Sequence, residues 1–310
     1  MIKPSTASKE HLPVIKKASG KHIWDIDGKK YLDFTGSNLT VTIGHKKYRF
    51  KNTPNFPGKS YLEDEVSKQL SKYTGTKYFR YFKNGSDAVS CSIRLARNIL
   101  NKPDAVVCYV GYGGSHNEYA RTVNSKGIPY TPSAQLQMGF GMTRFEGLDY
   151  APENIDILIF ESRFPGVAEF KADIKICDHL KSGINGLWED VNADFHLYGK
   201  SLANGYPVAV MTGKNKYMKR IDEIYYSTTF GGDNIGLEAI KQTLKKYDRK
   251  KWLKLKEYAD SVLPPWQSLD ENKIKQFTKN GVLFNGYWAI FQSHTKEDID
   301  RLASLCKKIL

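Results

Sequence analysis

The sequence lacks the marks of a membrane or secreted protein. No uninterrupted apolar run approaches the length that crosses a bilayer, and the first residues, Met1–Thr6, contain no hydrophobic segment of the signal-peptide kind. Both absences favour a cytoplasmic protein. The cysteines are few, far apart and without paired spacing, so we expect reduced core thiols, and neither a disulfide framework nor a metal site. They are Cys91, Cys108, Cys177 and Cys306.

The sequence also lacks the patterns of metal, repeat and nucleic-acid-binding proteins. The 7 histidines are dispersed without an HExxH-like pair, so no protein-bound metal is expected. There are no internal repeats and no low-complexity linker. A net charge of +14 is compatible with nucleic-acid binding, but the lysines are spread along the whole chain. We interpret the densest clusters, 245–246 and 249–251, as a solvated helix face, and expect neither nucleic acid nor membrane as a partner.

What is present indicates a globular α/β protein. The 310 residues suffice for one large domain, or for one large and one small domain. Short apolar runs with the character of buried parallel strands alternate with helix-like or polar stretches, which favours a mostly parallel sheet. These runs are Ala105–Val110, Ile155–Phe160, Leu187–Val191 and Pro207–Thr212.

Further elements are predicted on both sides of these runs. The segment Gly20–Phe34 predicts a hairpin, because alternating apolar residues flank Asp27-Gly28, a type I′ turn signal. The tail from about Lys250 predicts a small lobe, which we expect to pack with this hairpin. The other predicted elements are helices over 62–73, 84–100 and from 235, a strand over 78–82, and in the tail a lysine-rich helix, a strand over 281–284 and a helix from 296.

One lysine is distinguished by its surroundings. Lys200 lies among small residues just after a predicted strand, with Asp194 six positions ahead and Gly205-Tyr-Pro207 behind. Lysine is the side chain that forms Schiff bases with pyridoxal phosphate or with carbonyl substrates. The segment therefore indicates an amine placed to meet a carbonyl, although a single lysine in a lysine-rich chain is more often a solvated cation.

Two glycine-containing turns follow predicted strands. Asn84-Gly85-Ser86 opens a helix, where glycine lets an anion approach the backbone and the helix dipole favours negative charge. Alternatively, Asn84 or Ser86 only caps that helix. Tyr112 lies in a glycine-rich loop after the run 105–110, and such loops form the ligand crevice of parallel sheets. It is a candidate to stack on a planar cofactor or, alternatively, an exposed turn residue.

Two further segments carry carboxylates and hydroxyls. Glu189 and Asp190 lie near the end of the run Leu187–Val191. A carboxylate at the end of a strand can pair with a protonated ring nitrogen and hold it charged, or it can cap nearby donors. The turn Tyr226–Gly232, which includes Thr229, offers a second phosphate contact or another helix cap.

The order of these elements resembles one known family. Phosphate turn, aromatic loop, strand-end acid, lysine and hydroxyl-rich turn follow one another as in the class III, fold-type I pyridoxal-phosphate aminotransferases, in the glutamate-1-semialdehyde aminomutase-like branch. The resemblance extends over nearly the whole chain. The matching segments are Trp24–Phe34 with Gly44-His45, Lys83–Ala88 with Ile93–Arg97, Gly111-Tyr112, Glu161, Asp194–Pro207, Thr229–Gly232, Gly281–Phe284 and His294–Asp300.

The resemblance implies a fold and a domain plan. The fold is α/β, the pyridoxal-phosphate-dependent transferase fold type I, with a mostly parallel seven-stranded large-domain sheet that carries helices on both faces. A small α+β lobe is built from both termini. We expect residues 1–45 in the N-terminal part of the small lobe, 46–248 in the cofactor-binding large domain and 249–310 in the C-terminal small domain.

The resemblance also implies the cofactor, pyridoxal 5′-phosphate, and the residues around it. Lys200 would form the Schiff base and carry a proton between the substrate Cα and C4′ of the cofactor. Asp190 would keep the pyridinium protonated, with Glu189 as the alternative. Tyr112 would cover the ring. The phosphate would be bound by Asn84, Gly85 and Ser86, and by Thr229 of the partner subunit in a homodimer.

The chain departs from the family pattern in several respects. It is considerably shorter than expected for the family. The stretch between the predicted strand-end acids and Asp194 is nearly gone. No arginine precedes Arg49, whereas the aminomutases carry an N-terminal arginine for the substrate carboxylate.

The sequence therefore predicts a cytoplasmic, pyridoxal-phosphate-dependent aminotransferase or aminomutase that acts on a small-molecule amine or amino acid. Three alternatives stay open. The first is an aminotransferase for another substrate, such as an amino sugar. The second is a degenerate relative without catalysis. The third is a basic binding module that uses the fold as a scaffold.

Overall fold

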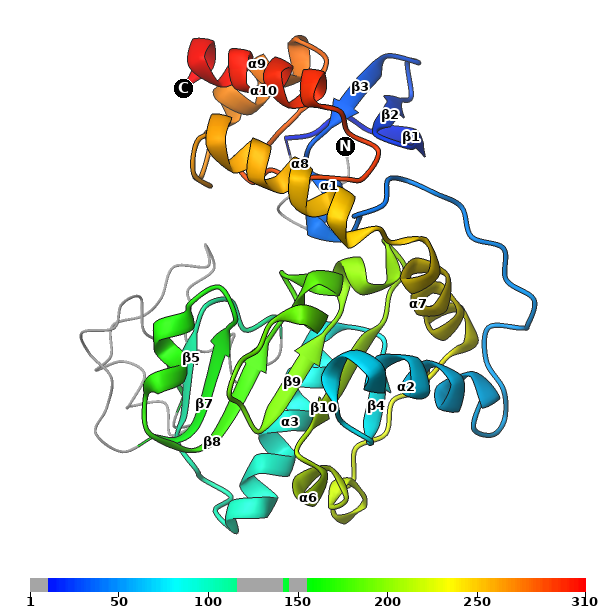
Figure 1. The fold of residues 1–310 in the computed structure, drawn as a ribbon, viewed down its shortest axis with the longest axis vertical. Coiled ribbons are helices and arrows are strands. Elements are labelled where there is room, and N and C mark those ends of the chain that lie inside the picture. The colour runs from blue at the N-terminus through cyan, green and yellow to red at the C-terminus, as the bar shows by residue number, and fades with distance from the viewer. Residues whose placement is uncertain (1–10, 116–141, 145–154) are drawn as a thin grey trace. The chain divides into compact units, whose positions relative to one another are not determined.

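The computed structural model describes residues 11–115, 142–144 and 155–310, and the chain divides into two compact units (Figure 1). The large unit comprises residues 50–202 and 206–241, and the small unit comprises residues 1–49, 203–205 and 242–310. The domain boundaries predicted after residues 45 and 248 stay a prediction. Residues 1–6, which carried the expectation of no signal peptide, lie outside the described residues.

The large unit is built on one sheet of seven strands in the order β4-β10-β9-β8-β7-β5-β6. Strand β10 runs antiparallel to both of its neighbours, and every other neighbouring pair is parallel. The predicted α/β class with a mostly parallel sheet is confirmed. The strands are β4 (Phe79–Phe82), β5 (Val107–Val110), β6 (Met142–Arg144), β7 (Ile155–Glu161), β8 (Ala172–Asp178), β9 (Phe195–Tyr198) and β10 (Ala209–Gly213).

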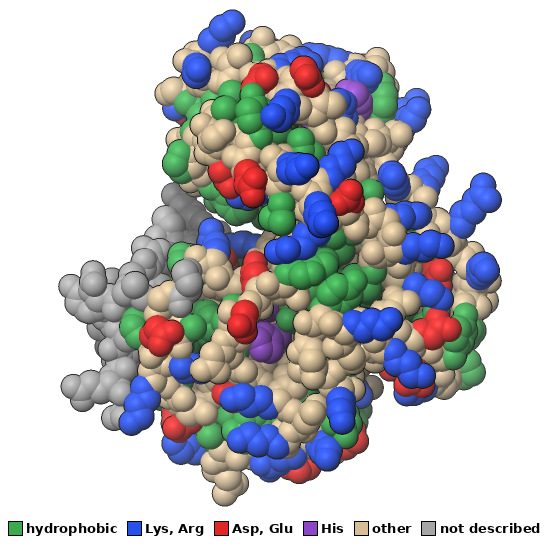
Figure 2. Space-filling model, in the orientation of Figure 1, with side chains coloured by type: hydrophobic (Ala, Val, Ile, Leu, Met, Phe, Trp, Pro, Cys, Tyr) green, Lys and Arg blue, Asp and Glu red, His purple; other side chains and the backbone are tan. Residues whose placement is uncertain are grey.

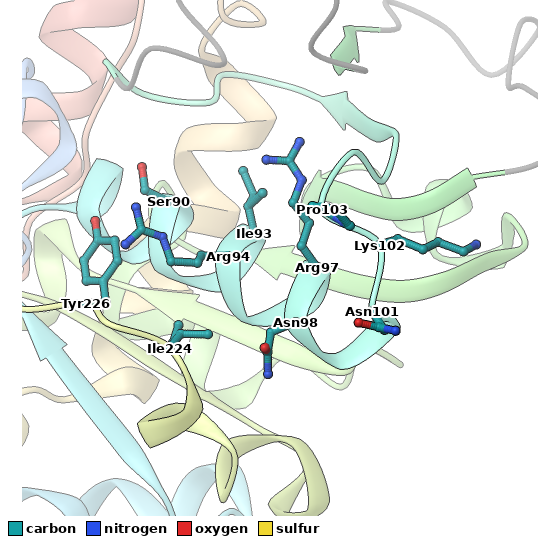
Figure 3. Close-up of a pocket in the computed structure, with 10 residues that line it drawn as sticks. All are labelled: Ser90, Ile93, Arg94, Arg97, Asn98, Asn101, Lys102, Pro103, Ile224 and Tyr226. Carbon is teal, nitrogen blue, oxygen red and sulfur yellow. The ribbon is translucent and has the colours of Figure 1, made fainter.

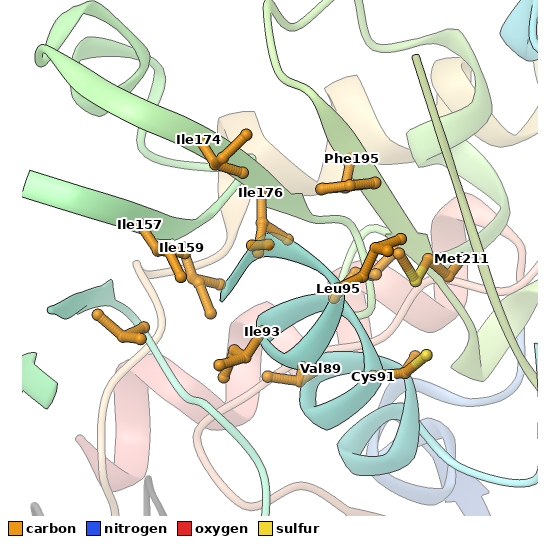
Figure 4. Close-up of a cluster of buried hydrophobic side chains, with 14 of the residues drawn as sticks. Val89, Cys91, Ile93, Leu95, Ile157, Ile159, Ile174, Ile176, Phe195 and Met211 are labelled. Atoms are coloured by element: carbon orange, nitrogen blue, oxygen red, sulfur yellow. The ribbon is translucent and has the colours of Figure 1, made fainter. Parts of the chain in front are cut away.

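Helix α3 (Gly85–Leu100) packs on one face of this sheet (Figure 4). Val89 and Ile93 lie one helical turn apart and share a buried cluster with Ile159 and Ile176 of the strands. Burying a large aliphatic side chain contributes about 1.5–3 kcal/mol. This packing holds the first turn of α3 close to the ends of the strands.

A second buried cluster lies on the opposite face. Cys108, Leu158 and Cys177 come from three neighbouring strands and pack with Val167 of the short helix η3 (Pro165–Glu169). The strands are thus apolar on both faces, as is typical of parallel sheets. The remaining helices whose bounds fall in this unit or at its end are α2 (Tyr61–Thr74), η4 (Gly183–Trp188), η5 (Lys200–Ala203), α6 (Asn215–Met218), η6 (Ile221–Glu223) and α7 (Asn234–Lys246).

The small unit combines strands and helices from both ends of the chain. Its sheet has the order β1-β2-β3-β11, in which β11 runs parallel to β3 and the other pairs are antiparallel. Phe34, Phe277 and Leu302 belong to its main buried cluster. The elements are β1 (Ile15–Ser19), β2 (His22–Asp25), β3 (Lys30–Asp33), β11 (Val282–Leu283), α1 (Gly36–Leu39), α8 (Arg249–Val262), α9 (Glu271–Lys279) and α10 (Lys296–Ile309).

The predicted N-terminal hairpin is confirmed as the pair β2 and β3. Asp25 fixes its turn, since Oδ1 accepts hydrogen bonds from the N–H groups of Asp27 at 3.1 Å and Lys29 at 2.8 Å. Gly28 has φ +85°, the left-handed backbone for which glycine carries no steric cost. The turn chemistry therefore agrees with the residues that predicted it.

One predicted strand is wrong. Leu187–Val191 lies partly in η4 and continues as irregular chain. Gly186 explains the compact turn, because a Cβ there would lie 2.6 Å from Cβ of His179. The unpredicted strand β8 precedes it. Asp173 and Lys175 interrupt the apolar run of β8, so its sequence did not read as a buried strand.

The surface gives two further observations. Figure 2 shows Lys and Arg side chains scattered over the visible face of each unit and mixed with acidic ones, as the dispersed lysines predict. Among the described residues, no helix is both long and apolar enough to span a membrane.

Candidate active site

The carboxyl ends of the parallel strands carry most of the chemically active side chains of the large unit. Strand β5 is followed by the loop that contains Tyr112, β7 ends at Glu161, β8 ends at Asp178, and β9 is followed by Lys200. Because neighbouring parallel strands end at the same edge of a sheet, these residues lie at one edge.

Lys200 is held in an unusual backbone conformation. Its φ is +46°, which costs a residue with a side chain of order 1–3 kcal/mol and is found preferentially at functional sites. The preceding Gly199 has no room for a side chain, since a Cβ would lie 2.7 Å from Cδ2 of Leu180. The N–H of Leu202 donates to the carbonyl of Gly199 at 2.9 Å and closes the turn. The sequence around Lys200 thus fixes the backbone from which its side chain projects.

The amine of Lys200 is largely shielded from water, although the residue as a whole is partly exposed. Within the described residues, its Nζ makes no hydrogen bond or ion pair. Burial lowers the pKa of Lys200 from its usual value, and the nearby Lys181 cation lowers it further. Asp178 and Glu161 act in the opposite direction. Because the net effect is a lowered pKa, a larger fraction of this amine is neutral and nucleophilic near pH 7 than for a surface lysine.

Asp178 is a fully enclosed carboxylate at the end of β8. Its side chain is only 3% exposed. Oδ1 accepts the N–H of Leu180 at 2.8 Å, and Oδ2 accepts the hydroxyl of Tyr109 at 2.6 Å. Burial raises the pKa of Asp178, against the effect of these two donors and of the Lys200 charge. Such a carboxylate is suited to accept a hydrogen bond from a protonated nitrogen in the low dielectric of the site.

Glu161 organises the charges around the site. Oε1 accepts the N–H of Tyr112 at 2.6 Å and the amine of Lys181 at 2.8 Å, and Oε2 pairs with Nε of Arg163. Burial by itself would raise the pKa of Glu161, but the cation of Lys181, with these donors, holds it below its usual value. Glu161 therefore stays charged and fixes both the Tyr112 loop and two cations.

The predicted phosphate turn lies at the first turn of α3. The side chain of Asn84 accepts the N–H of Asp87 at 3.0 Å, so Asn84 is the N-cap of this helix. The N–H groups of Gly85 and Ser86 have no partner among the described residues, as expected for a first turn. Oγ of Ser86 accepts the N–H of Ser115 at 2.9 Å and joins this turn to the Tyr112 loop.

Tyr112 projects from that loop with 54% of its surface exposed. The Nζ of Lys181 lies 5.7 Å from the centre of its ring. The ring is thus accessible, and its backbone is tied to Glu161. Its predicted role, stacking on a cofactor ring, stays a prediction.

The structure does not bring every predicted residue to this edge. Asp190 and Glu189 follow η4 instead of ending a strand, and neither is among the charges that act on Lys200. Asp190 is exposed, whereas Glu189 contacts Nδ1 of His179 at 2.8 Å. Their assignment to a ring nitrogen rested on the family resemblance and on a predicted strand that proved wrong. The acids that end strands in this region are Asp178 on β8 and Glu161 on β7.

Two other predicted residues lie elsewhere. Thr229 is exposed, and its carbonyl accepts a hydrogen bond from the side-chain amide of Asn55 at 3.1 Å. Asp194 precedes β9, at the opposite end of that strand from Lys200, where it accepts the N–H of Lys175 at 2.8 Å and pairs with Lys214. Asp194 therefore fastens β9 to β8 and positions Lys200 only through the strand.

Sequence reasoning missed Asp178 and Lys181. One signal was present, namely the sequence Ile174–Asp178, in which apolar residues on both sides of Lys175 are followed by an acid. Lys181 follows three residues later, and no pattern distinguished it from the other lysines.

A separate pocket of about 820 Å³ lies on the outer side of α3 (Figure 3). Its floor includes Ile93, and Arg94 lies over the ring of Tyr226 at 5.1 Å. None of the strand-end residues lines it. The lining residues are Ser90, Ile93, Arg94, Arg97, Asn98, Asn101, Lys102, Pro103, Ile224 and Tyr226.

Comparison with known proteins identifies the relatives of the chain. Residues 185–306 match the family model of aminotransferase class-III. The glutamate-1-semialdehyde 2,1-aminomutase of Campylobacter hominis is 24% identical over 311 residues, which cover 84% of this chain and 68% of that protein. The same enzyme of Desulfitobacterium hafniense is 23% identical over 363 residues, which cover 96% of this chain and 82% of that protein. The family resemblance inferred from the sequence is confirmed.

Solved structures show the same fold. A transaminase with bound pyridoxal phosphate superimposes with a TM-score of 0.78 at 14% identity, covering 96% of this chain and 90% of that one. A glutamate-1-semialdehyde aminomutase from Pseudomonas aeruginosa, in complex with PMP, superimposes with a TM-score of 0.75 at 16% identity. The match covers 96% of this chain and 88% of that one. The predicted fold of the pyridoxal-phosphate-dependent transferases is confirmed.

Proposed function

We propose, on the premise that this chain belongs with the class III aminotransferases, that it moves amino groups on small molecules with pyridoxal 5′-phosphate as its cofactor. The observation that carries the proposal is Lys200, a buried amine with a lowered pKa and a left-handed backbone at the strand ends, close to the charges of Asp178 and Glu161.

The residues at this edge fit the cofactor. The Lys200 amine is a buried polar group without a described partner, and Asp178 is a buried carboxylate that can pair with a ring nitrogen. The N–H groups of Gly85 and Ser86, which have no partner in the described part of the chain, lie at the positive end of a 16-residue helix and suit a phosphate. Amine, acid and anion cradle match the three polar parts of pyridoxal phosphate.

Each residue has a distinct task in this proposal. Bound pyridoxal phosphate supplies an aldehyde that takes up amino groups and a ring that accepts electrons from the substrate Cα. Lys200 would hold the cofactor through its aldehyde, and its Nζ, once freed by the substrate amine, would carry a proton from the substrate Cα to C4′ of the cofactor. Asp178 holds the proton on the ring nitrogen. Glu161 holds Lys181 in place, and the charge of Lys181 lowers the pKa of Lys200.

The phosphate and the ring are held from several sides in the proposal. Gly85 and Ser86 bind the phosphate through backbone N–H groups, while Asn84 caps the helix that carries them. Tyr112 covers the ring. Thr229 binds the phosphate of a partner subunit, which requires a homodimer. Light scattering of the purified chain tests this last point, since a monomer at working concentration would exclude a role for Thr229.

We assign the reaction to the glutamate-1-semialdehyde aminomutase type, supported by the relatives of that name. The alternative is an aminotransferase for another amine, supported by the absence of any arginine before Arg49. The two differ in their need for an amino acceptor. An aminomutase converts its substrate without added acceptor, whereas an aminotransferase shows ping-pong dependence on donor and acceptor.

The proposal also places the enzyme in the cytoplasm. The four cysteines are free and buried, as expected for a protein of a reducing compartment.

The proposal is tested by the absorption spectrum of the protein purified with pyridoxal phosphate. We expect a visible band that is lost on adding an amino donor and regained on adding a keto acid. Lys200→Ala abolishes this band, and Cys306→Ser, a matched change in the buried core of the small unit, retains it. A wild-type protein without the band, or a Lys200→Ala variant that shows it equally, contradicts the proposal.

A further inference from the structure

One cluster of possible metal ligands in the large unit, two of them buried and one partly exposed, has no part in the proposed amino-group transfer. Cys177 lies on β8 and His196 on β9, and the two are direct partners in the parallel pair. His179 follows Cys177 by two residues and so points to the same face. Ligand atoms of the three side chains all lie within 4.8 Å of one another, and in the described part of the chain no other three such residues do so.

We propose that Cys177, His179 and His196 bind a divalent transition-metal ion, with Zn²⁺ as the best match. A thiolate and two imidazoles are ligands that zinc prefers, at about 2.3 Å for sulfur and 2.0–2.1 Å for nitrogen. Two nitrogens on one tetrahedral zinc lie roughly 3.3 Å apart by these lengths. Nε2 of His179 and Nδ1 of His196 lie 3.1 Å apart. The nitrogen pair is therefore already at the spacing that a shared ion requires.

Cys177 can complete this set with a small movement. A sulfur and a nitrogen on one tetrahedral zinc lie roughly 3.6 Å apart by the same bond lengths. The 4.8 Å limit on the present separations leaves about 1 Å to be closed. Rotation of a thiol about χ1 covers such a distance without any change in the strands.

Glu189 supplies the support that metal-binding histidines usually have. Its Oε2 lies 2.8 Å from Nδ1 of His179, which orients the ring and leaves the lone pair on Nε2. The ring of Tyr198 stacks on His179 at 4.8 Å and an interplanar angle of 8°. His179 is therefore fixed in the ring orientation and tautomer that a ligand needs. One thiolate and the Glu189 carboxylate also balance the charge of a divalent ion.

The site has an entry path and an open position. Cys177 and His179 are buried, whereas His196 is partly exposed. An ion can therefore enter beside His196, and a water can take the fourth position, as is typical of sites with three protein ligands. A bound ion would link β8, which ends at Asp178, to β9, which precedes Lys200.

The test measures zinc itself on the complete chain, loaded with pyridoxal phosphate and free of affinity tags. The protein is stripped with a chelator, and Zn²⁺ binding is then measured by equilibrium dialysis with elemental analysis. We expect one zinc per chain. Cys177→Ser and His196→Gln should weaken binding at least 100-fold, and Glu189→Gln about 10–100-fold. Cys108→Ser, which changes an equally buried thiol on β5, should leave it unchanged.

Two controls keep the result decisive. Co²⁺ in place of zinc should give a thiolate-to-metal absorption band, seen in the difference spectrum of wild type and absent in Cys177→Ser. Lys200→Ala should still bind one zinc, so failure of the metal site and failure of the proposed function are separable. Binding of less than one zinc in ten chains, or equal binding by Cys177→Ser and wild type, overturns the proposal. The two histidines would then form only a hydrogen bond.

Discussion

The two ends of strand β8 carry the same pair of residue types in opposite surroundings. At the start of β8, Asp173 lies 3.4 Å from Lys102, and both side chains are about half exposed, at 55% and 53%. At its end, Asp178 is only 3% exposed, and the charge of Lys200 partly opposes the rise in its pKa caused by burial. A hydrogen bond to Asp156 raises the pKa of Lys102, whereas burial lowers the pKa of Lys200.

The difference shows that position in the fold decides what a lysine and an aspartate do. In water the ion pair at the start of β8 is screened and contributes little to stability. At the carboxyl end, burial lowers the pKa of an amine and raises that of a carboxylate that can pair with a nitrogen.

The largest expected effect is the loss of turnover in Lys200→Ala. Without the amine, the cofactor is not bound covalently and the proton at the substrate Cα has no base, so amino-group transfer should fall by a factor of 10³ or more. Lys102→Ala should retain turnover within about two-fold, because its charge lies in solvent. Steady-state assays with an amino donor measure both. Equal loss in the two variants would contradict the contrast.

Asp178→Asn should have the next largest effect. The amide cannot hold the proton of the ring nitrogen as a carboxylate does, so kcat should fall on the order of 10²–10³-fold. Asp173→Asn on the same strand and Asp190→Asn beyond η4 are the matched controls, with kcat expected within about two-fold. A large loss in Asp190→Asn with an active Asp178→Asn would restore the assignment made from the sequence.

Glu161→Gln should reduce stability. The change removes a buried carboxylate that holds the Tyr112 loop, Lys181 and Arg163, and we expect a loss of about 1–3 kcal/mol in the free energy of unfolding. Urea denaturation measures it. Glu65→Gln breaks an exposed pair with Lys241 and should cost no more than about 0.5 kcal/mol. Equal midpoints for both variants would show that Glu161 does not organise the site.

The smallest effect is a shift in pH dependence in Lys181→Met. The Lys181 cation lowers the pKa of Lys200, so its removal raises that pKa and moves the neutral form to higher pH. The rate of cofactor capture should therefore rise at a higher pH than in wild type. This pH should still lie below the one at which a free lysine reacts, because the burial of Lys200 remains. Stopped-flow capture across pH measures this, and Lys214→Met is the matched control. A shift to lower pH would contradict the charge assignment.

The sequence predicted most of the fold because its elements follow local rules. The hairpin came from Asp27-Gly28, and α3 came from apolar residues at helical spacing. The α/β class came from four apolar runs, three of which are strands. Lys200 and Tyr112 were found because each follows a predicted strand, where parallel sheets place their ligands.

The rest required long-range contacts. Asp178 was not predicted because Asp173 and Lys175 interrupt the apolar pattern of β8. The strand-end acid was predicted in Leu187–Val191 instead, where the compact turn depends on the packing of Gly186 against His179. The cluster of Cys177, His179 and His196 is invisible in spacing along the chain, because only the register of β8 and β9 brings it together. Whether any of the predicted residues binds a cofactor stays a prediction.

One measurement tests the central claim most directly. The protein is loaded with pyridoxal phosphate, treated with a hydride reagent that fixes the cofactor to its lysine, digested, and analysed by peptide mass spectrometry. The account predicts one cofactor per chain, on the peptide that contains Lys200. Cofactor fixed to Lys181, to Lys102 or to many lysines in small amounts would contradict it.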